Sequence, residues 1–157
     1  MQLTYFGANG WLLEFAGQRL LLDPWLVGPR RFGGAGWLFE GRLPREWPIP
    51  GDLDGLLLTQ GLPDHAHPAT LERLSKELPV IGSAAAVQQA RRFGFTQNDT
   101  LRPGERLQRG SLEIQATAGA PVPQVENGYL LRGSGEACMW SPMASWIRLC
   151  PPNRSLR

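Results

Sequence analysis

Histidine is scarce in this chain of 157 residues, which contains only His65 and His67. A zinc site built mainly from imidazole needs three or more histidines, so multi-histidine metal enzymes are largely excluded. The chain has only two cysteines, Cys138 and Cys150, and they form neither a disulfide framework nor a CxxC pair. Sparse cysteine favours a reducing compartment, and we therefore expect a cytoplasmic protein.

Long apolar runs are also missing, since no stretch approaches about 18 apolar residues without a charge. We therefore expect no membrane-spanning helix and no membrane partner. The opening residues lack the basic start and apolar stretch of a secretory signal. Lysine is nearly absent, with Lys76 alone among 16 Lys and Arg residues, and a net charge of +2 is too small to indicate nucleic acid by itself.

Three short strands are predicted at the start of the chain, over residues 3–6, 11–15 and 19–23. Asn9-Gly10 is a strong hairpin signal between the first two strands. The third strand is continuously apolar, which favours burial on both faces, and Asp23-Pro24 ends it. The pattern indicates an antiparallel meander that enters a core.

Residues 24–51 show no period of two or 3.6, and they are rich in proline, glycine and aromatic side chains. We interpret them as an irregular surface loop that tucks its aromatics, including Phe32, Trp37 and Phe39, against the body. Such long loops are often functional lids or binding loops, and a covering loop with a purely structural role is equally compatible with the sequence.

Regular structure returns after residue 52, where the pattern alternates strands and helices. The predicted strands cover residues 54–59 and 79–82, and the predicted helices cover residues 69–78 and 84–93. Pro68 suits the first position of the first helix, while Ser83 caps the second helix and Gly94 ends it.

The second half returns to strands, predicted over residues 106–108, 112–116, 128–132 and 136–140. Residues 141–157 contain several prolines and no clear period, so we predict a poorly packed tail, truncated or altered at its end. The domain organisation expected is one domain over residues 1–140, followed by this tail.

The loop after the buried strand 54–59 lies where α/β proteins place ligand sites. It reads Thr59-Gln60-Gly61-Leu62-Pro63-Asp64-His65, and here the sequence resembles the metallo-β-lactamase superfamily, whose hallmark is Ser/Thr-His-x-His-x-Asp-His. Thr59, Asp64 and His65 match that motif. Gln60 and Leu62 stand where two metal-ligand histidines belong.

The resemblance implies an α/β (α+β) fold, a metallo-β-lactamase-like αββα sandwich of two mixed sheets flanked by helices, short at the C-terminus. It implies a zinc-dependent hydrolase ancestor and places Asn9 and Asp23 at the cleft. Ala120 falls at the third histidine, and the region expected to supply a later aspartate contains no acid.

Only Asp64 and His65 remain of the implied ligands, whereas catalytic zinc keeps three protein ligands and a water. His67 would complete a two-histidine, one-carboxylate set, although residues two apart need not converge. Structural roles compete with metal binding. Asp64 could instead accept backbone N–H bonds at the entry to the helix, and His65 could be a partly buried histidine bonded to Asp64 or to a backbone carbonyl.

We therefore expect a degenerate, non-zinc member that acts as a binding or scaffold protein, with no cofactor and with a small molecule or protein at the old cleft. Leu62 would fill the space of the ion while Gln60 bonds Asp64 and His65. The alternative is a residual hydrolase in which Asp64 and His65 hold zinc. A weaker alternative is a nucleic-acid-binding module that uses a basic patch. The arginines that could form this patch are Arg91, Arg92, Arg102, Arg106 and Arg109. The competing interpretation is that they form an ordinary charged face exposed to solvent.

Overall fold

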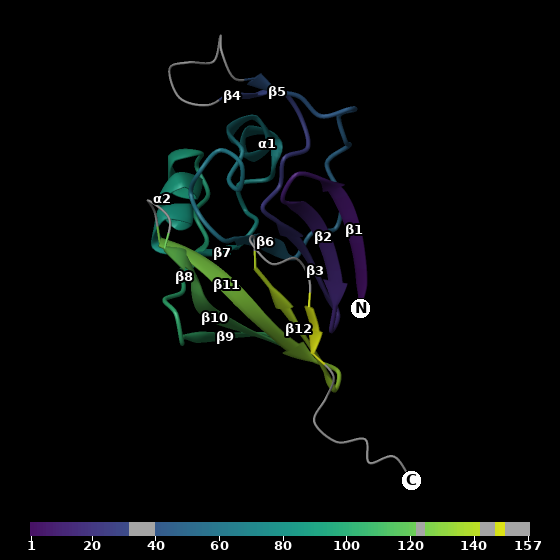
Figure 1. Cartoon of the computed structure of the whole chain (residues 1–157), viewed down its shortest axis with the longest axis vertical. Coiled ribbons are helices and arrows are strands. Elements are labelled where there is room, and N and C mark those ends of the chain that lie inside the picture. Colours follow the sequence, from purple (N-terminus) through teal and green to yellow (C-terminus); the bar gives the residue numbers. More distant parts are fainter. Residues whose placement is uncertain (32–39, 122–124, 142–146, 150–157) are drawn as a thin grey trace.

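The computed structural model describes residues 1–31, 40–121, 125–141 and 147–149, so the expectations for Phe32, Trp37, Phe39 and Cys150 lie outside the described residues. Two β-sheets pack against each other in a sandwich (Figure 1). The first sheet has the order β1-β2-β3-β6-β7-β8. Its strands are β1 (Gln2–Gly7), β2 (Gly10–Phe15), β3 (Gln18–Leu22), β6 (Gly55–Leu58), β7 (Val80–Gly82) and β8 (Asn98–Thr100).

The first sheet is mixed. Strands β1, β2 and β3 form the predicted antiparallel meander, and β3 then pairs in parallel with β6. Strands β7 and β8 continue the parallel half. Strand β8 was not predicted, because Asn98 and Asp99 have low strand propensity and the strand is held by pairing with β7.

The second sheet has the order β13-β12-β11-β10-β9, and its described pairs are all antiparallel, whereas a mixed sheet was predicted. Its strands are β9 (Arg106–Arg109), β10 (Leu112–Pro121), β11 (Val125–Gly133), β12 (Glu136–Trp140) and β13 (Ile147–Leu149). Short connections between successive strands produce this arrangement, because parallel neighbours need long crossovers. Strand β13 pairs with β12 inside the segment predicted as a tail, most of which lies outside the described residues.

Both described helices, α1 (Pro68–Arg73) and α2 (Ala84–Arg92), cover the face of the first sheet that points away from the second. Helix α2 matches its prediction, and the Ser83 hydroxyl accepts a bond from Ala86 N at 3.3 Å. Helix α1 is shorter than predicted, since Leu74 is already extended. The Lys76 ammonium donates to the carbonyls of Leu71 and Glu72 and so satisfies the end of the helix.

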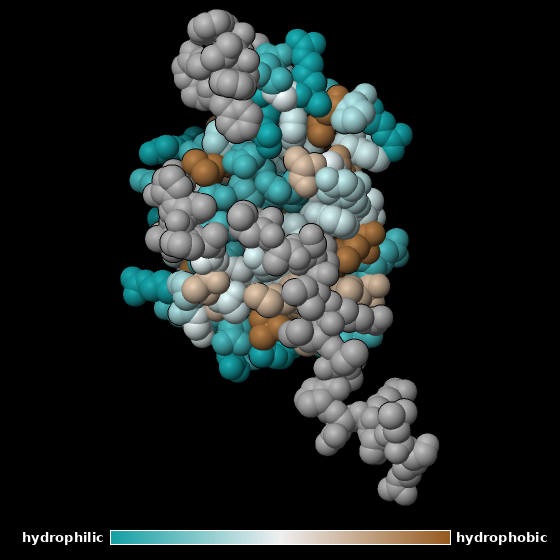
Figure 2. Space-filling view, in the orientation of Figure 1, coloured by the Kyte–Doolittle hydropathy of each residue, from teal (hydrophilic) through white to brown (hydrophobic). Residues whose placement is uncertain are grey.

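Two apolar clusters form the core. One lies between the sheets and includes Leu22, Leu57, Ile114 and Leu131, and the other lies between the first sheet and the helices. The α/β fold with two packed sheets is therefore confirmed. None of the described helices is long and apolar enough to cross a membrane. In Figure 2 the brown residues lie apart among teal and pale ones, so the coloured part of that face carries no broad apolar patch.

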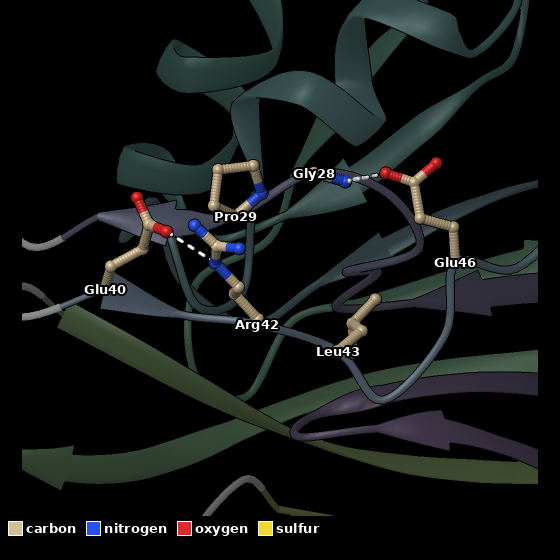
Figure 3. Close-up of a pocket in the computed structure, with 6 residues that line it drawn as sticks. All are labelled: Gly28, Pro29, Glu40, Arg42, Leu43 and Glu46. Atoms are coloured by element: carbon tan, nitrogen blue, oxygen red, sulfur yellow. Dashed lines mark hydrogen bonds and ion pairs between the residues drawn. The ribbon is translucent and has the colours of Figure 1, made fainter.

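The described parts of residues 24–51 cover one edge of the core. Trp47 packs against Phe6 and its indole N–H donates to the Phe6 carbonyl at 2.6 Å. The short strands β4 (Arg30–Arg31) and β5 (Glu40–Gly41) pair with each other. A cavity of about 340 Å³ opens beside them, where Glu40 bonds Arg42 and the Glu46 carboxylate accepts from Gly28 N (Figure 3).

Candidate functional site

The candidate site begins where β6 ends and runs through the loop to α1. Thr59 and Gln60 are buried directly after the strand. The Leu62 carbonyl then accepts bonds from His65 N at 2.9 Å and Ala66 N at 2.8 Å, so the chain turns back sharply. Pro68 starts α1, where a missing N–H costs nothing. This turn brings the imidazole of His65 into contact with Asp23, the residue that follows β3.

Asp23, directly after β3, is the centre of the buried network. Its side chain is fully buried, and one oxygen accepts from Thr59 N at 2.8 Å. The other oxygen accepts from the Thr59 hydroxyl at 2.7 Å and lies 3.0 Å from His65 Nδ1. A buried carboxylate is tolerated when its lone pairs are satisfied, and here three donors meet it. Asp23 therefore fixes both the loop and the orientation of the imidazole.

The other ring nitrogen of His65 faces Asp64 and Asn9. His65 Nε2 lies 3.5 Å from Asp64 Oδ2 and 3.2 Å from the Asn9 side-chain nitrogen. Burial alone would lower the pKa of His65, but the hydrogen bonds and charges of Asp23 and Asp64 outweigh it and raise the pKa to about 9. The hydrogen bond to His65 in turn lowers the pKa of Asp64. This raised pKa favours the protonated ring, in which both nitrogens donate to carboxylates. The Asn9 amide nitrogen donates to the Asp64 carbonyl at 3.2 Å, so it is then a neighbour of Nε2 and not its hydrogen-bond partner.

His67 does not join this group. Its Nδ1 lies 3.3 Å from the Thr70 hydroxyl, and its Nε2 lies 3.2 Å from the Pro29 carbonyl. Its ring also packs near Trp25, with centroids 5.6 Å apart. Burial lowers the pKa of His67, which favours the neutral form of this imidazole. The structure thus brings Asn9, Asp23, Asp64 and His65 together and directs His67 elsewhere.

Gln60 and Leu62, at the positions where the resemblance places two ligand histidines, do not form the plug expected from the sequence. Leu62 is only half-buried and belongs to neither core cluster. Gln60 is buried, but its Oε1 has no hydrogen-bond partner among the described residues. The contacts to His65 that were expected from Gln60 are made instead by Asn9, Asp23 and Thr59, whose hydroxyl lies 3.0 Å from His65 Nδ1. Ala120 lies in β10, near the end of that strand.

Glu126 was missed as a site residue. It is the second residue of β11 in the second sheet, it is only 3% exposed, and its Oε1 has no partner among the described residues. Burial raises the pKa of Glu126, and the charges of His65, Asp23 and Asp64 all act on it. The neighbouring Asn127 N donates to the Thr59 carbonyl at 3.1 Å, which ties this strand to the site. No local sequence signal marks Glu126, because its burial depends on the packing of the two sheets.

Gly61 is packed tightly against α2. A Cβ at this position would lie 2.6 Å from the Ala85 carbonyl oxygen, a backbone atom that cannot rotate away. We expect Gly61→Ala to lower the free energy of unfolding by about 1–3 kcal/mol, because either the loop or the helix must shift. Urea denaturation measures this. The control is Gly51→Ala, whose added Cβ meets nothing within 4 Å and whose expected effect is below about 0.5 kcal/mol. Equal stability of the two variants would contradict the packing described.

The donors around His65 do not fit the zinc ion that the sequence resemblance implies. Asp64 Oδ2 and His65 Nε2 supply two adjacent donors 3.5 Å apart, while His65 Nδ1 is bonded to Asp23 and so is not available to an ion. Within the described ranges, no group of three or more His, Cys, Asp or Glu side chains is placed to hold a metal ion. Gln60 and Leu62 add a neutral amide and an alkyl group, neither of which is a usual zinc ligand.

The chain is a two-sheet α/β sandwich with a polar site at the carboxyl ends of β3 and β6. The family described as "Beta-lactamase superfamily domain" matches residues 2–149, and the chain belongs to this family. The predicted resemblance is therefore confirmed.

Among curated proteins, the chain is 32% identical over 141 residues to protein Rv0786c of Mycobacterium tuberculosis, covering 85% of this chain and 58% of that protein. It is 28% identical over 146 residues to a UPF0173 metal-dependent hydrolase of Cereibacter sphaeroides, covering 86% and 60%. The chain thus spans about three fifths of the length of these relatives.

Solved structures show the same fold. A possible metal-dependent hydrolase from Veillonella parvula superposes with a TM-score of 0.70 at 16% identity, covering 89% of this chain and 62% of that one. The isothiocyanate hydrolase from Delia radicum gut bacteria has a TM-score of 0.66 at 20% identity, covering 88% and 60%. At these identities the likeness concerns the fold.

Proposed function

We propose that this chain is a member of the superfamily that does not carry out zinc-dependent hydrolysis and that acts as a binding or scaffold protein at the surface beside Gln60–His67. The observation that carries the proposal is the small number of metal-binding side chains at the loop. Asp64 Oδ2 and His65 Nε2 lie 3.5 Å apart, and among the described residues no third His, Cys, Asp or Glu side chain is placed with them to hold a metal ion. The ligand of the proposed binding protein is a small molecule or a protein, and its expected location is the cytoplasm.

Metal content tests this proposal. We expect protein purified from zinc-supplemented cells to carry far less than one zinc per chain by elemental analysis, because two protein ligands do not hold catalytic zinc. The same preparation is assayed with generic ester and phosphodiester substrates and added zinc, and no zinc-dependent turnover is expected. Stoichiometric zinc that disappears in His65→Ala would overturn the proposal.

The double variant Gln60→His/Leu62→His sharpens the same prediction. It should not gain zinc-dependent turnover, because Ala120 still provides no ligand and ligand sets act as units. Its stability should fall by only about 1 kcal/mol, since Leu62 is half-buried and little apolar area is lost. Turnover well above that of the wild-type chain would show that the site needs only these two histidines.

A residual metal-dependent hydrolase is the second candidate. It is favoured by the 3.5 Å separation of Asp64 Oδ2 and His65 Nε2, which suits two ligands of one ion, and by the metal-dependent hydrolases among the relatives. The nucleic-acid module has less support, because Arg106 pairs with Glu113 and Arg109 pairs with Asp99. These pairs reduce the positive charge that the arginine cluster offers to phosphates.

A further inference from the structure

A groove of about 670 Å³ runs along the exposed side of α2 and reaches the candidate site at Gly61. This volume suits a small-molecule ligand. One end is formed by the small residues Gly61, Ala84 and Ala85, where the loop packs closely on the start of α2. The remaining lining residues are Gln88, Gln89, Arg91 and Arg92.

The lining side chains of α2 share one side of the helix. Ala84 and Gln88 are four residues apart, and Arg91 and Arg92 follow three and four residues later, so successive turns present them to the same groove. Arg91 and Arg92 are exposed, and no acidic residue occurs within α2. The groove is therefore lined by two amide side chains and two guanidinium groups, with no carboxylate among them.

The arginines of the groove differ from most other described arginines. Neither Arg91 nor Arg92 has a carboxylate partner among the described residues, and Arg92 Nη1 instead donates to Gln89 Oε1 within the same helix at 3.4 Å. The arginines that do pair with carboxylates are Arg19, Arg42, Arg73, Arg106, Arg109 and Arg132. The charge at the groove is thus left available for a ligand.

We infer that this groove binds a small molecule carrying at least two anionic groups, phosphates or carboxylates, held by Arg91 and Arg92 and reached by the amide of Gln88. Guanidinium groups match both anions because their paired N–H donors fit two oxygens at once. The inference rests on the proposed binding role, since it names the ligand class for the surface that borders Gln60 and Gly61.

Calorimetric titration of the full chain with tripolyphosphate and with citrate, at about 150 mM salt, tests the inference. We expect at least one of the two probes to bind at one site per chain, and Arg91→Gln/Arg92→Gln to weaken that binding at least tenfold. The matched control is Arg102→Gln/Arg106→Gln, which removes the same charge elsewhere and should change affinity less than twofold. Gln88→Glu places a negative charge in the groove, leaves both arginines intact, and should weaken binding at least threefold.

Three results would overturn the inference: binding of neither probe, equal weakening in the control pair, or binding of a short single-stranded oligonucleotide alone through the same arginines. Thermal melting of every variant checks that the fold is kept, as expected for exposed side chains. Zinc-dependent turnover is measured on the same preparations. If zinc-dependent turnover is found together with anion binding through Arg91 and Arg92, only the non-catalytic proposal is refuted. If neither turnover nor anion binding is found, only the inference of anion binding in the groove is refuted.

Discussion

Replacing Asp23 with alanine is expected to lower the free energy of unfolding by about 3–5 kcal/mol, the range for breaking a buried ion pair by removing one partner. The side chain is fully buried and accepts from Thr59 N and the Thr59 hydroxyl, with His65 Nδ1 3.0 Å away. Alanine would leave the imidazolium and two donors without their acceptor. Its φ of 39° adds strain, because this left-handed region suits Asp and Asn better than alanine. Chemical denaturation measures the loss.

Two variants separate the charge of Asp23 from its shape. Asp23→Asn keeps the size of the side chain and its tolerance of the left-handed backbone, so it should lower the free energy of unfolding less than Asp23→Ala does. Because it removes the charge, it should also lower the pKa of His65 from about 9. NMR titration of the imidazole follows that shift. Glu77→Ala, at an exposed acid, controls for loss of a carboxylate and should change stability by less than about 0.5 kcal/mol. A similar cost for Asp23→Ala and Glu77→Ala would rule out the buried network as a stabilising element.

Stability should fall by about 2–3 kcal/mol as the pH rises from 7 to 9.5. The pKa of His65 is about 9 in the folded chain and 6.5 in the unfolded chain, so the folded state retains a proton that the unfolded state has lost. Stabilisation by the imidazolium is therefore complete below pH 6.5 and disappears as the pH passes through about 9. This window lies above the range in which His67 titrates, since burial lowers the pKa of His67.

The control for this pH dependence is His65→Gln, which removes the titrating ring while leaving a polar group of comparable length. Its stability should be lower at pH 7 and should fall by less than about 1 kcal/mol up to pH 9.5. That remaining loss comes from the Cys138 thiol, because burial raises its pKa to about 11 in the folded chain. Urea denaturation at several pH values gives both curves. A wild-type chain whose stability is flat over this range would show that Asp23 and Asp64 do not hold His65 protonated.

Local patterns predicted the elements that local chemistry determines. The opening meander, β6, β7 and α2 were all expected, because apolar runs, a serine cap and a terminal glycine mark them directly. Helix α1 was predicted too long, since its end depends on Lys76 reaching back to two carbonyls. The extension of β10 through Ala118-Gly119-Ala120 depends on pairing with β11, which overrides weak strand propensity.

The candidate site was only partly visible in the sequence. The resemblance brought in Asn9, Asp23, Asp64 and His65, and the structure places them within one network. The sequence did not indicate that the His67 side chain would face the Pro29 carbonyl. In a loop, a spacing of two residues between His65 and His67 does not determine whether their rings converge. Glu126 was missed for a related reason, since its burial arises only when the second sheet closes over the first.

The bonds between Asp23 and Thr59 join residues on either side of the crossover that links β3 to β6. The crossover must close before these bonds form, and closing it costs chain entropy early in folding. The Thr59 amide should therefore exchange its hydrogen only when the first sheet opens as a whole, rather than by fraying of the loop. Its exchange rate would report global opening of the protein from within the candidate site.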